Sequence, residues 1–129
     1  MQTYATKLIV KPEHIDDLNH VNNIQYVTWV QDIAIEHWEE ATTKPIKNNY
    51  FWVLLEHHIS YKKPAFLNDV LEVKTYIKEN KGVTSLRCVD FYNIETNTLL
   101  ASSTTTWCLF NRTSEKPNRI TAEIMNCFK

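Results

Sequence analysis

The 129-residue sequence predicts an α+β fold: a five-stranded antiparallel sheet wrapped around one long central helix, with a short C-terminal helix. Residues 24–41 have the apolar periodicity of a helix over most of its circumference. Five segments, one before this helix and four after it, have the β-prone, largely alternating composition of strands. A helix that is apolar on several sides must be enclosed, and a curved sheet is the simplest partner for it.

The first strand is predicted at residues 3–11, where Pro12 ends the alternation. A polar turn follows, and either Asn22 or Asn23 is suited to act as the N-cap of the central helix. The polar seam of this helix is narrow, and Asp32 and Glu36 lie on it. After Ala41, the segment 42–49 contains a proline and paired asparagines, which predicts a loop.

Four strands and a short helix complete the pattern. The second strand begins near Tyr50, and its predicted core face contains Phe51, Val53, Leu55, His57, Ile59 and Tyr61. The third strand, residues 71–78, leads to a tight turn at residues 80–82, and strands at 83–94 and 98–110 form a hairpin. The final helix is predicted at residues 120–128, with Thr121 as a suitable cap.

Composition limits the functional classes. With 43% hydrophobic and 22% charged residues, residues 1–129 are expected to form a single globular domain, and no apolar run approaches the length of about 20 residues that crosses a membrane. A net charge of −1 without a Lys/Arg block argues against nucleic acid as a partner. A single glycine, Gly82, excludes glycine-rich phosphate loops.

Metal and redox chemistry are not expected either. The three cysteines, Cys88, Cys108 and Cys127, form no Cys-x-x-Cys pair, which disfavours a zinc site or a disulfide framework. Histidines and aspartates between residues 14 and 20 match no metal-ligand spacing, so we expect neither a metal nor a cofactor. The amino terminus lacks the pattern of a secretory signal, and the expected location is the cytoplasm.

The turn before the helix has the residues of an acyl-transfer site. Asp16, Asp17 and His20 immediately precede the first turn of the helix, whose backbone N–H groups lack intrahelical partners and lie at the positive end of the helix dipole. A carboxylate can deliver or activate a nucleophile while such N–H groups hold the developing oxyanion. The alternative is that these are ordinary turn residues.

Three segments resemble a known family. The run Asp16-x-x-x-His20-Val21-Asn22-Asn23-x-x-Tyr26-x-x-Trp29, the segment 59–69 and the tail 111–120 are similar to the hotdog-fold thioesterases, in the branch of 4-hydroxybenzoyl-CoA thioesterase and the acyl-acyl-carrier-protein thioesterases. The resemblance covers nearly the whole chain. It implies a homodimer whose second strands pair edge to edge, with two active sites at the subunit interface, each at the start of a central helix.

The resemblance also implies roles for individual residues. Asp16 would attack the thioester or activate water, and the N–H of Asn23 would polarise the carbonyl. The remaining candidates are His20 beside the carboxylate, Asn22 at the cap, Tyr26 and Trp29 against the acyl chain, His57 facing the partner's site, and Lys62 and Lys63 for phosphate contacts, with Arg87, Arg112 and Arg119 in the same pool of cations.

Two departures from the family pattern concern the turn. The plant acyl-carrier-protein enzymes place an asparagine two residues after the aspartate, and Leu18 stands at that position here. Leucine has no polar group, so a polar relay through this position is not expected. The turn also lacks the glycines of many relatives, so Asp17 can replace Asp16 by a one-residue shift of the loop. We favour Asp16.

The predicted function is therefore that of a cytoplasmic thioesterase in fatty acid metabolism, which hydrolyses acyl-CoA or acyl-carrier-protein thioesters without a cofactor, as a homodimer or a tetramer. Two alternatives use the same scaffold. A hydratase or dehydratase is disfavoured because its glycine- and proline-containing turn is absent. A non-catalytic acyl-CoA-binding domain would bind the same ligand without turnover.

Asp32 and Glu36 on the helix are a further pair of candidate catalytic carboxylates, since another branch of the hotdog family uses a carboxylate on the helix. They fit the solvent-exposed edge of the helix better.

Overall fold

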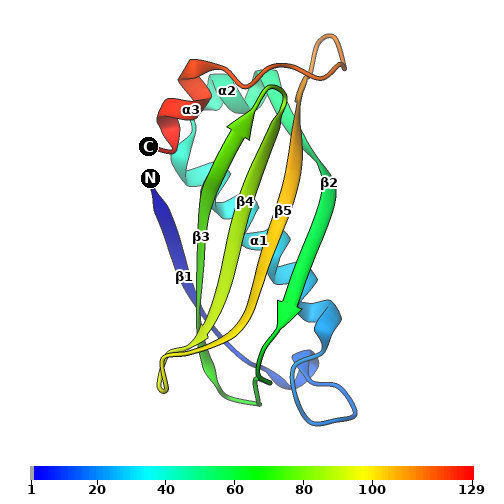
Figure 1. Ribbon diagram of the computed structural model, residues 1–129, viewed down its shortest axis with the longest axis vertical. Coiled ribbons are helices and arrows are strands. Elements are labelled where there is room, and N and C mark those ends of the chain that lie inside the picture. The colour runs from blue at the N-terminus through cyan, green and yellow to red at the C-terminus, as the bar shows by residue number, and fades with distance from the viewer. Residues whose placement is uncertain (1) are drawn as a thin grey trace.

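Residues 2–129 are described by a computed structural model. Its elements in chain order are β1 (Thr3–Ile9), a 3₁₀ turn η1 (Pro12–His14), α1 (Asn23–Ala41), α2 (Lys44–Asn49), β2 (Tyr50–Tyr61), β3 (Val70–Lys81), β4 (Thr84–Asn93), β5 (Thr98–Asn111) and α3 (Ala122–Cys127). The five strands form one antiparallel sheet in the order β1-β3-β4-β5-β2. One face of this sheet is crossed by α1, and α2 and α3 lie together at one end (Figure 1). The predicted fold class is confirmed.

The central helix begins and ends where its local sequence provides caps. The side chain of Asn22 accepts a hydrogen bond from the N–H of Ile24 (2.9 Å), as an N-cap does. At the other end, the Thr42 N–H donates to the carbonyl of Trp38 (3.2 Å). Six residues of α1 are buried, namely Tyr26, Trp29, Val30, Ile33, Ala34 and His37. The predicted central helix is therefore present, with one side buried against the sheet, and Asn22 rather than Asn23 is its cap.

The segment after α1 differs from the prediction. Residues 42–49 were expected to form a loop, but Lys44–Asn49 form α2. The Thr43 hydroxyl accepts from the N–H of Ile46 (3.5 Å), and Pro45 lies in the first turn, where a missing N–H costs no intrahelical bond. Ile46, a residue of α2, is buried and anchors this helix to the core. A capping threonine followed by proline is a helix-start pattern, and this explains the difference.

The second strand also differs, because it contains a β-bulge. Its register with β5 shifts between Leu54 and Glu56, so the inward-facing set changes parity there. Trp52 packs against the core before the bulge and Ile59 after it. The prediction that Val53 and Leu55 belong to the core face is wrong, since they are 37% and 55% exposed.

The remaining elements follow the sequence pattern. The turn between β3 and β4 contains Gly82 at φ +63°, a left-handed conformation that suits glycine. Strands β4 and β5 form the predicted hairpin, and the Thr121 hydroxyl caps α3 by accepting from the Ile124 N–H (3.1 Å). Within residues 2–129, no helix is long and apolar enough to cross a membrane.

The interior consists of two hydrophobic clusters along α1. The larger surrounds Tyr26, Trp29 and Phe91 near the start of the helix. The smaller surrounds Ile46, Leu109 and Ile124 beside α2 and α3, and Trp38 of α1 packs against it. The start of α1 is consequently held by aromatic packing on its inner side, while the turn before it lies at the surface.

Candidate active site

The polar turn before α1 is closed by its own backbone. Ile15 and Val21 form an isolated antiparallel bridge, and the Asp16 N–H donates to the His20 carbonyl (3.0 Å). Inside this loop the Asn19 N–H donates to the Asp16 carbonyl (3.1 Å), and Asn19 has a φ of +64°, which asparagine tolerates better than most residues. The turn is therefore a fixed structure and not an open loop.

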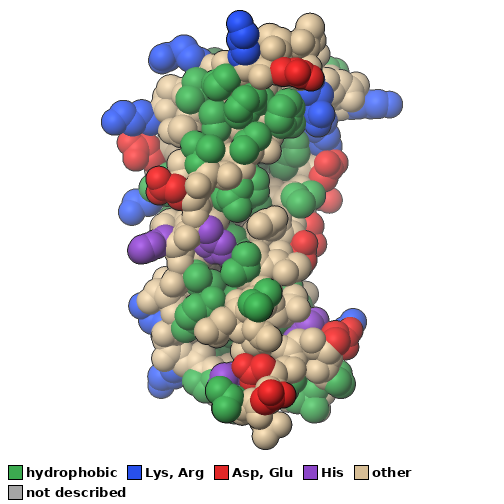
Figure 2. Space-filling model, turned by 90° about the vertical axis from the view of Figure 1, so that its right-hand side faces the viewer, with side chains coloured by type: hydrophobic (Ala, Val, Ile, Leu, Met, Phe, Trp, Pro, Cys, Tyr) green, Lys and Arg blue, Asp and Glu red, His purple; other side chains and the backbone are tan. Residues whose placement is uncertain are grey.

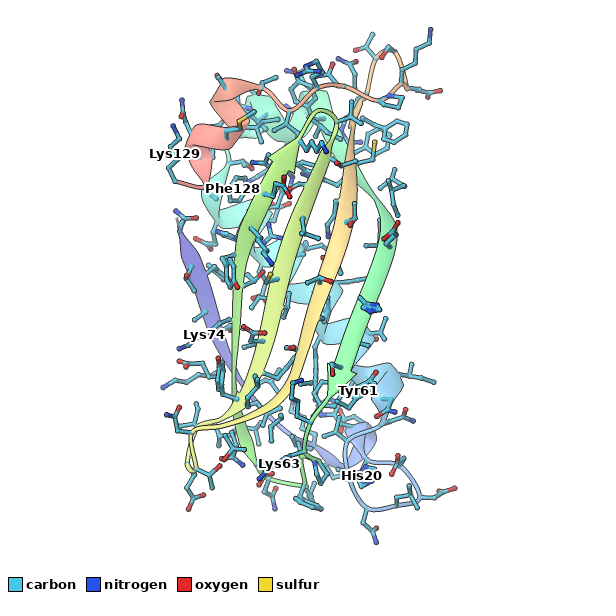
Figure 3. The ribbon with its side chains drawn as sticks, in the orientation of Figure 1. His20, Tyr61, Lys63, Lys74, Phe128 and Lys129 are labelled. Carbon is cyan, nitrogen blue, oxygen red and sulfur yellow. The ribbon has the colours of Figure 1, made fainter. Side chains whose placement is uncertain are left out.

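The turn is also attached to two neighbouring segments. The Val21 N–H donates to the carbonyl of Ala65 (2.8 Å), before β3, and the Asn22 N–H donates to the carbonyl of His14 (2.9 Å), in η1. The ring of His14 in turn contacts Trp29 edge to face (5.0 Å between centroids). Figure 3 shows His20, Lys63 and the side chain of Tyr61 at this same end of the molecule.

The two aspartates of the turn have different surroundings. The Asp16 side chain is 26% exposed, and its Oδ1 accepts the N–H of Leu18 (2.9 Å). Asp17 is exposed, and no side-chain hydrogen bond to it is present within residues 2–129. Nδ1 of His20 lies 3.8 Å from Oδ1 of Asp16, beyond hydrogen-bond distance but close enough for an ion pair when the ring is protonated. The turn thus orients Asp16, whereas Asp17 extends into solvent.

The first backbone N–H of α1 is free to bind a ligand. The Ile24 N–H is satisfied by the Asn22 side chain, and the Gln25 N–H donates to the Asn22 carbonyl (2.9 Å). The Asn23 N–H has no acceptor among residues 2–129. It therefore combines an unused donor with the positive end of the helix dipole, as an oxyanion site requires. The Asn22 side chain is engaged in the cap.

Aromatic residues support this helix start from inside. Tyr26 is 3% exposed and packs edge to face against Trp29, Tyr61 and Phe91. Burial, with smaller contributions from Tyr61 and Asp69, raises the pKa of Tyr26 to about 12, so the phenol is neutral. Its hydroxyl is buried and has no hydrogen-bond partner in the described chain. Tyr26 and Trp29 are therefore packing residues of the core behind the helix start, and Tyr26 is not an acid–base group.

Tyr61 is a site residue whose role the sequence did not indicate. It is the last residue of β2, 42% exposed, and its hydroxyl donates to the carbonyl of Asn23 (3.2 Å). This bond joins the end of an edge strand to the peptide that follows the free N–H. The only sequence signal was its place in the predicted strand, directly before Lys62-Lys63, and that pattern does not specify a contact with residue 23.

His57 is not brought to the turn within one chain. It lies four residues before Tyr61 on β2, which corresponds to about 13 Å along a strand. Its Nε2 is buried and lacks a partner in residues 2–129, and burial, followed by the charge of His58, lowers its pKa. His57 is therefore largely neutral near pH 7 and distant from Asp16 of its own chain.

The two lysines lie on the exit from β2. The N–H groups of Lys62 and Lys63 both donate to the carbonyl of Leu100 (2.8 and 3.1 Å), which fixes the backbone and leaves both residues exposed. The Lys62 Nζ reaches only Ser60 Oγ (3.4 Å). Arg87, from the same pool of cations, is instead buried in the molecule. Among residues 2–129, no group of three or more His, Cys, Asp or Glu side chains could hold a metal ion.

A five-stranded antiparallel sheet around one long helix is the architecture of the hotdog fold, and here the helix starts at a carboxylate-bearing turn. The family model described as the acyl-ACP thioesterase N-terminal domain matches residues 1–128, and the chain therefore belongs to the acyl-ACP thioesterase family. The predicted fold and family are confirmed.

Individual relatives agree with this assignment. The long-chain acyl-CoA thioesterase FadM of Escherichia coli K12 is 24% identical over 83 residues, and the match spans 63% of each chain, less than two thirds of that relative's length. Among solved structures, YbaW, a probable thioesterase from Escherichia coli, superposes with a TM-score of 0.87 at 19% identity, over 95% of this chain and 94% of its own. Slr0204, a 1,4-dihydroxy-2-naphthoyl-CoA thioesterase from Synechocystis, has a TM-score of 0.84 at 15% identity, over 98% and 95%. At these identities the two structures establish a shared fold.

Proposed function

We propose that this chain hydrolyses acyl-CoA thioesters to the free acid and CoA, with Asp16 as the catalytic carboxylate. The observation that carries the proposal is an oriented Asp16 side chain in the closed turn that leads directly to α1, whose first N–H, that of Asn23, is unused. The substrate class is supported by the names of FadM and Slr0204, both thioesterases of CoA esters. An acyl-carrier-protein thioester, which the family description suggests, is the alternative carrier.

Two routes use the same carboxylate. In one, Asp16 removes a proton from water, the hydroxide adds to the thioester carbon, and the C–S bond then breaks to release CoA thiolate, which takes up a proton. In the other, Asp16 itself adds, CoA thiolate leaves, and water hydrolyses the resulting anhydride to the acid. In both, negative charge develops on the carbonyl oxygen, and the Asn23 N–H at the positive end of α1 stabilises it. The net reaction consumes one water and releases one acid and one thiol.

The remaining candidates have supporting roles in this proposal. His20, 3.8 Å from Asp16, would stabilise the ionised carboxylate or donate to the leaving thiolate. Tyr26 and Trp29 would contact the acyl group, and Asn22 would hold the helix start through its cap. Lys62 and Lys63 lie next to Tyr61 at the same end of the molecule and would contact the phosphates of CoA.

We further propose that the active form is a homodimer, or a tetramer built from it, in which β2 pairs with its copy. β2 is an edge strand, and apolar side chains are exposed on it and on the adjacent helix, notably Leu55 (55%), Ile35 (56%) and Ile24 (73%). Figure 2 shows hydrophobic side chains along this side of the molecule. An exposed apolar patch beside an open edge is typical of an interface. In that dimer, His57 would face the partner.

Residues 1–129 would act as one domain, and we place the enzyme in the cytoplasm.

The test is thiol release from a panel of acyl-CoAs by wild type, Asp16→Asn and Asp17→Asn. The substitution at Asp16 should lower kcat/KM by about 10²-fold or more, since an acid–base group is lost, and Asp17→Asn, the matched control, should retain activity. Activity that survives Asp16→Asn but not Asp17→Asn would assign the role to Asp17. Tight acyl-CoA binding without turnover would favour a binding domain, and hydration of crotonyl-CoA would favour a hydratase.

A further inference from the structure

A cavity lies beside the distal half of α1, away from the turn. It has a volume of about 330 Å³, at the lower end of the range for small-molecule sites. Its walls come from α1, α2, the sheet and the C-terminal segment. More than half of the lining residues are apolar, and five of these are aromatic: Trp38, Phe51, Trp52, Trp107 and Phe128. Figure 3 places Phe128 toward the opposite end of the long axis from His20. Nothing in the proposed hydrolysis uses this cavity within one chain.

The cavity contains a buried guanidinium. Arg87, on the inner face of β4, is 6% exposed and lines the cavity. Its Nη1 donates to His37 Nδ1 (2.8 Å) and to Thr75 Oγ1 (3.0 Å). Arg87 forms no ion pair with a carboxylate in residues 2–129, and its Nε and Nη2 groups have no protein acceptor there. A buried arginine is normally paired, so an unpaired one that faces a cavity indicates an anionic ligand.

The groups in contact with Arg87 leave its charge in place. Burial, and then the charge of Arg87, lower the pKa of His37 to about 4, so the imidazole is neutral near pH 7. Its Nδ1 accepts from Arg87, which leaves Nε2 as the donor to Gln2 Oε1 (2.6 Å). The Thr75 hydroxyl accepts from Arg87 and donates its own hydrogen bond to the Cys88 carbonyl (2.8 Å). These neutral partners orient one nitrogen of Arg87 and supply no negative charge.

The charged residues at the rim of the cavity do not neutralise the charge of Arg87 either. Lys47 forms an ion pair with Glu39 (3.2 Å), so these two lining residues cancel. Arg112 lies over the ring of Phe51 (5.3 Å) and donates through Nε to the Lys47 carbonyl (3.0 Å). The cavity therefore has a net positive charge from Arg87 and Arg112, inside a largely apolar wall.

We propose that this cavity binds an organic carboxylate with an apolar body, in which the carboxylate accepts from the free donors of Arg87 and an alkyl or aryl group fills the space between the tryptophans. The guanidinium presents parallel donors that match the two oxygens of a carboxylate. The apolar walls favour a monoanion with a hydrophobic tail over a strongly hydrated anion such as phosphate.

Two sources supply this chemistry. One is a free fatty or aromatic acid, the product class of the reaction proposed above. The other is a carboxylate at the distal end of an acyl group that is bound as its thioester, and this source rests on the proposed function. In a dimer whose β2 strands run antiparallel, the Phe51 end of one β2 lies near the Tyr61 end of the partner's β2. The cavity of one protomer would then lie near the helix start of its partner.

The binding test uses octanoate, with 1-octanol as the uncharged analogue, measured by calorimetry and by fluorescence of the cavity tryptophans. Octanoate should bind the wild type, and binding should weaken by at least about tenfold in Arg87→Gln, which removes the charge-assisted bond. Arg119→Gln, at an exposed position outside the cavity, is the matched control. If Arg87→Gln does not fold, Ala34→Leu fills the cavity, keeps the guanidinium and should also weaken binding.

The proposal is overturned if octanoate does not bind, if 1-octanol binds equally well, or if a folded Arg87→Gln variant retains wild-type affinity. The source is decided by comparing hydrolysis of ω-carboxyoctanoyl-CoA with that of octanoyl-CoA. A preference for the first substrate that disappears in Arg87→Gln assigns the site to the acyl tail, and an unchanged ratio assigns it to free acids. If no acyl-CoA is hydrolysed, the proposed function fails while the binding result stands on its own.

Discussion

At the residue scale, the helix start depends on one hydrogen bond from another element. The Tyr61 hydroxyl donates to the Asn23 carbonyl (3.2 Å), next to the N–H that we propose as the oxyanion donor. We expect Tyr61→Phe to lower kcat more than it raises KM, because the hydroxyl would position a group that acts in the transition state. Stability should fall by about 0.5–1.5 kcal/mol.

The measurement is steady-state thiol release together with urea unfolding. Tyr92→Phe is a suitable control, since the Tyr92 hydroxyl has no hydrogen bond in the described part of the chain. Wild-type kcat in a Tyr61→Phe enzyme that has lost stability would assign the bond a structural role alone.

The residues that sequence analysis identified are those whose partners are local. Asp16, His20 and the Asn22 cap lie within a few positions of one another, and local spacing indicates such relations directly. Tyr61 and Arg87 were not assigned their contacts because these join residues 38 and 50 positions apart. Such contacts depend on how the sheet pairs, and a single sequence does not encode the pairing in any local pattern.

At the element scale, the N-terminus of α1 determines both stability and the proposed chemistry. Replacement of Asn22 by alanine removes the acceptor for the Ile24 N–H and should lower the free energy of unfolding by about 1 kcal/mol. Activity should fall as well, because a frayed first turn would displace the Asn23 N–H. Asn22→Asp keeps an acceptor and places a negative charge at the positive end of the helix, so it should retain stability.

Chemical denaturation of wild type, Asn22→Ala and Asn22→Asp compares the three proteins. Equal denaturant midpoints of unfolding for wild type and Asn22→Ala would contradict the assignment of Asn22 as the helix cap. A loss of activity without a loss of stability in Asn22→Ala would indicate that the side chain contacts the substrate.

Elements were predictable to the extent that their periodicity is uninterrupted. The α1 stripe and the β4–β5 hairpin follow directly from alternation and turn residues. The bulge near Leu55 interrupts β2 without a glycine or proline to mark it, and the predicted core residues Val53 and Leu55 are exposed there. The short α2 was missed because its paired asparagines indicated a loop, although Thr43 followed by Pro45 is a helix-start pattern.

At the scale of the whole molecule, the sheet covers only one side of α1. Figure 1 shows α1 behind the sheet, with β2 at one lateral edge and the chain termini close together near the opposite edge. The Gln2 N–H donates to the Phe128 carbonyl (3.3 Å), so the β1 side is partly closed by the chain itself. The β2 side has no such cover in residues 2–129, and exposed apolar residues lie on β2 and on the neighbouring α1, namely Ile24, Ile35, Val53, Leu55 and Tyr61.

This asymmetry makes the proposed interface testable with a single charge. Leu55, which is 55% exposed at the bulge, would lie against the partner strand, and Leu55→Lys would place two like charges near the two-fold axis. We expect wild type to have the mass of two or four chains by light scattering, and Leu55→Lys to shift toward monomer with reduced activity. Ile94→Lys, 37% exposed beyond the end of β4, is the control that should remain assembled. A wild-type monomer with full activity at all concentrations would show that one chain contains the entire site, and His57 would then have no partner to face.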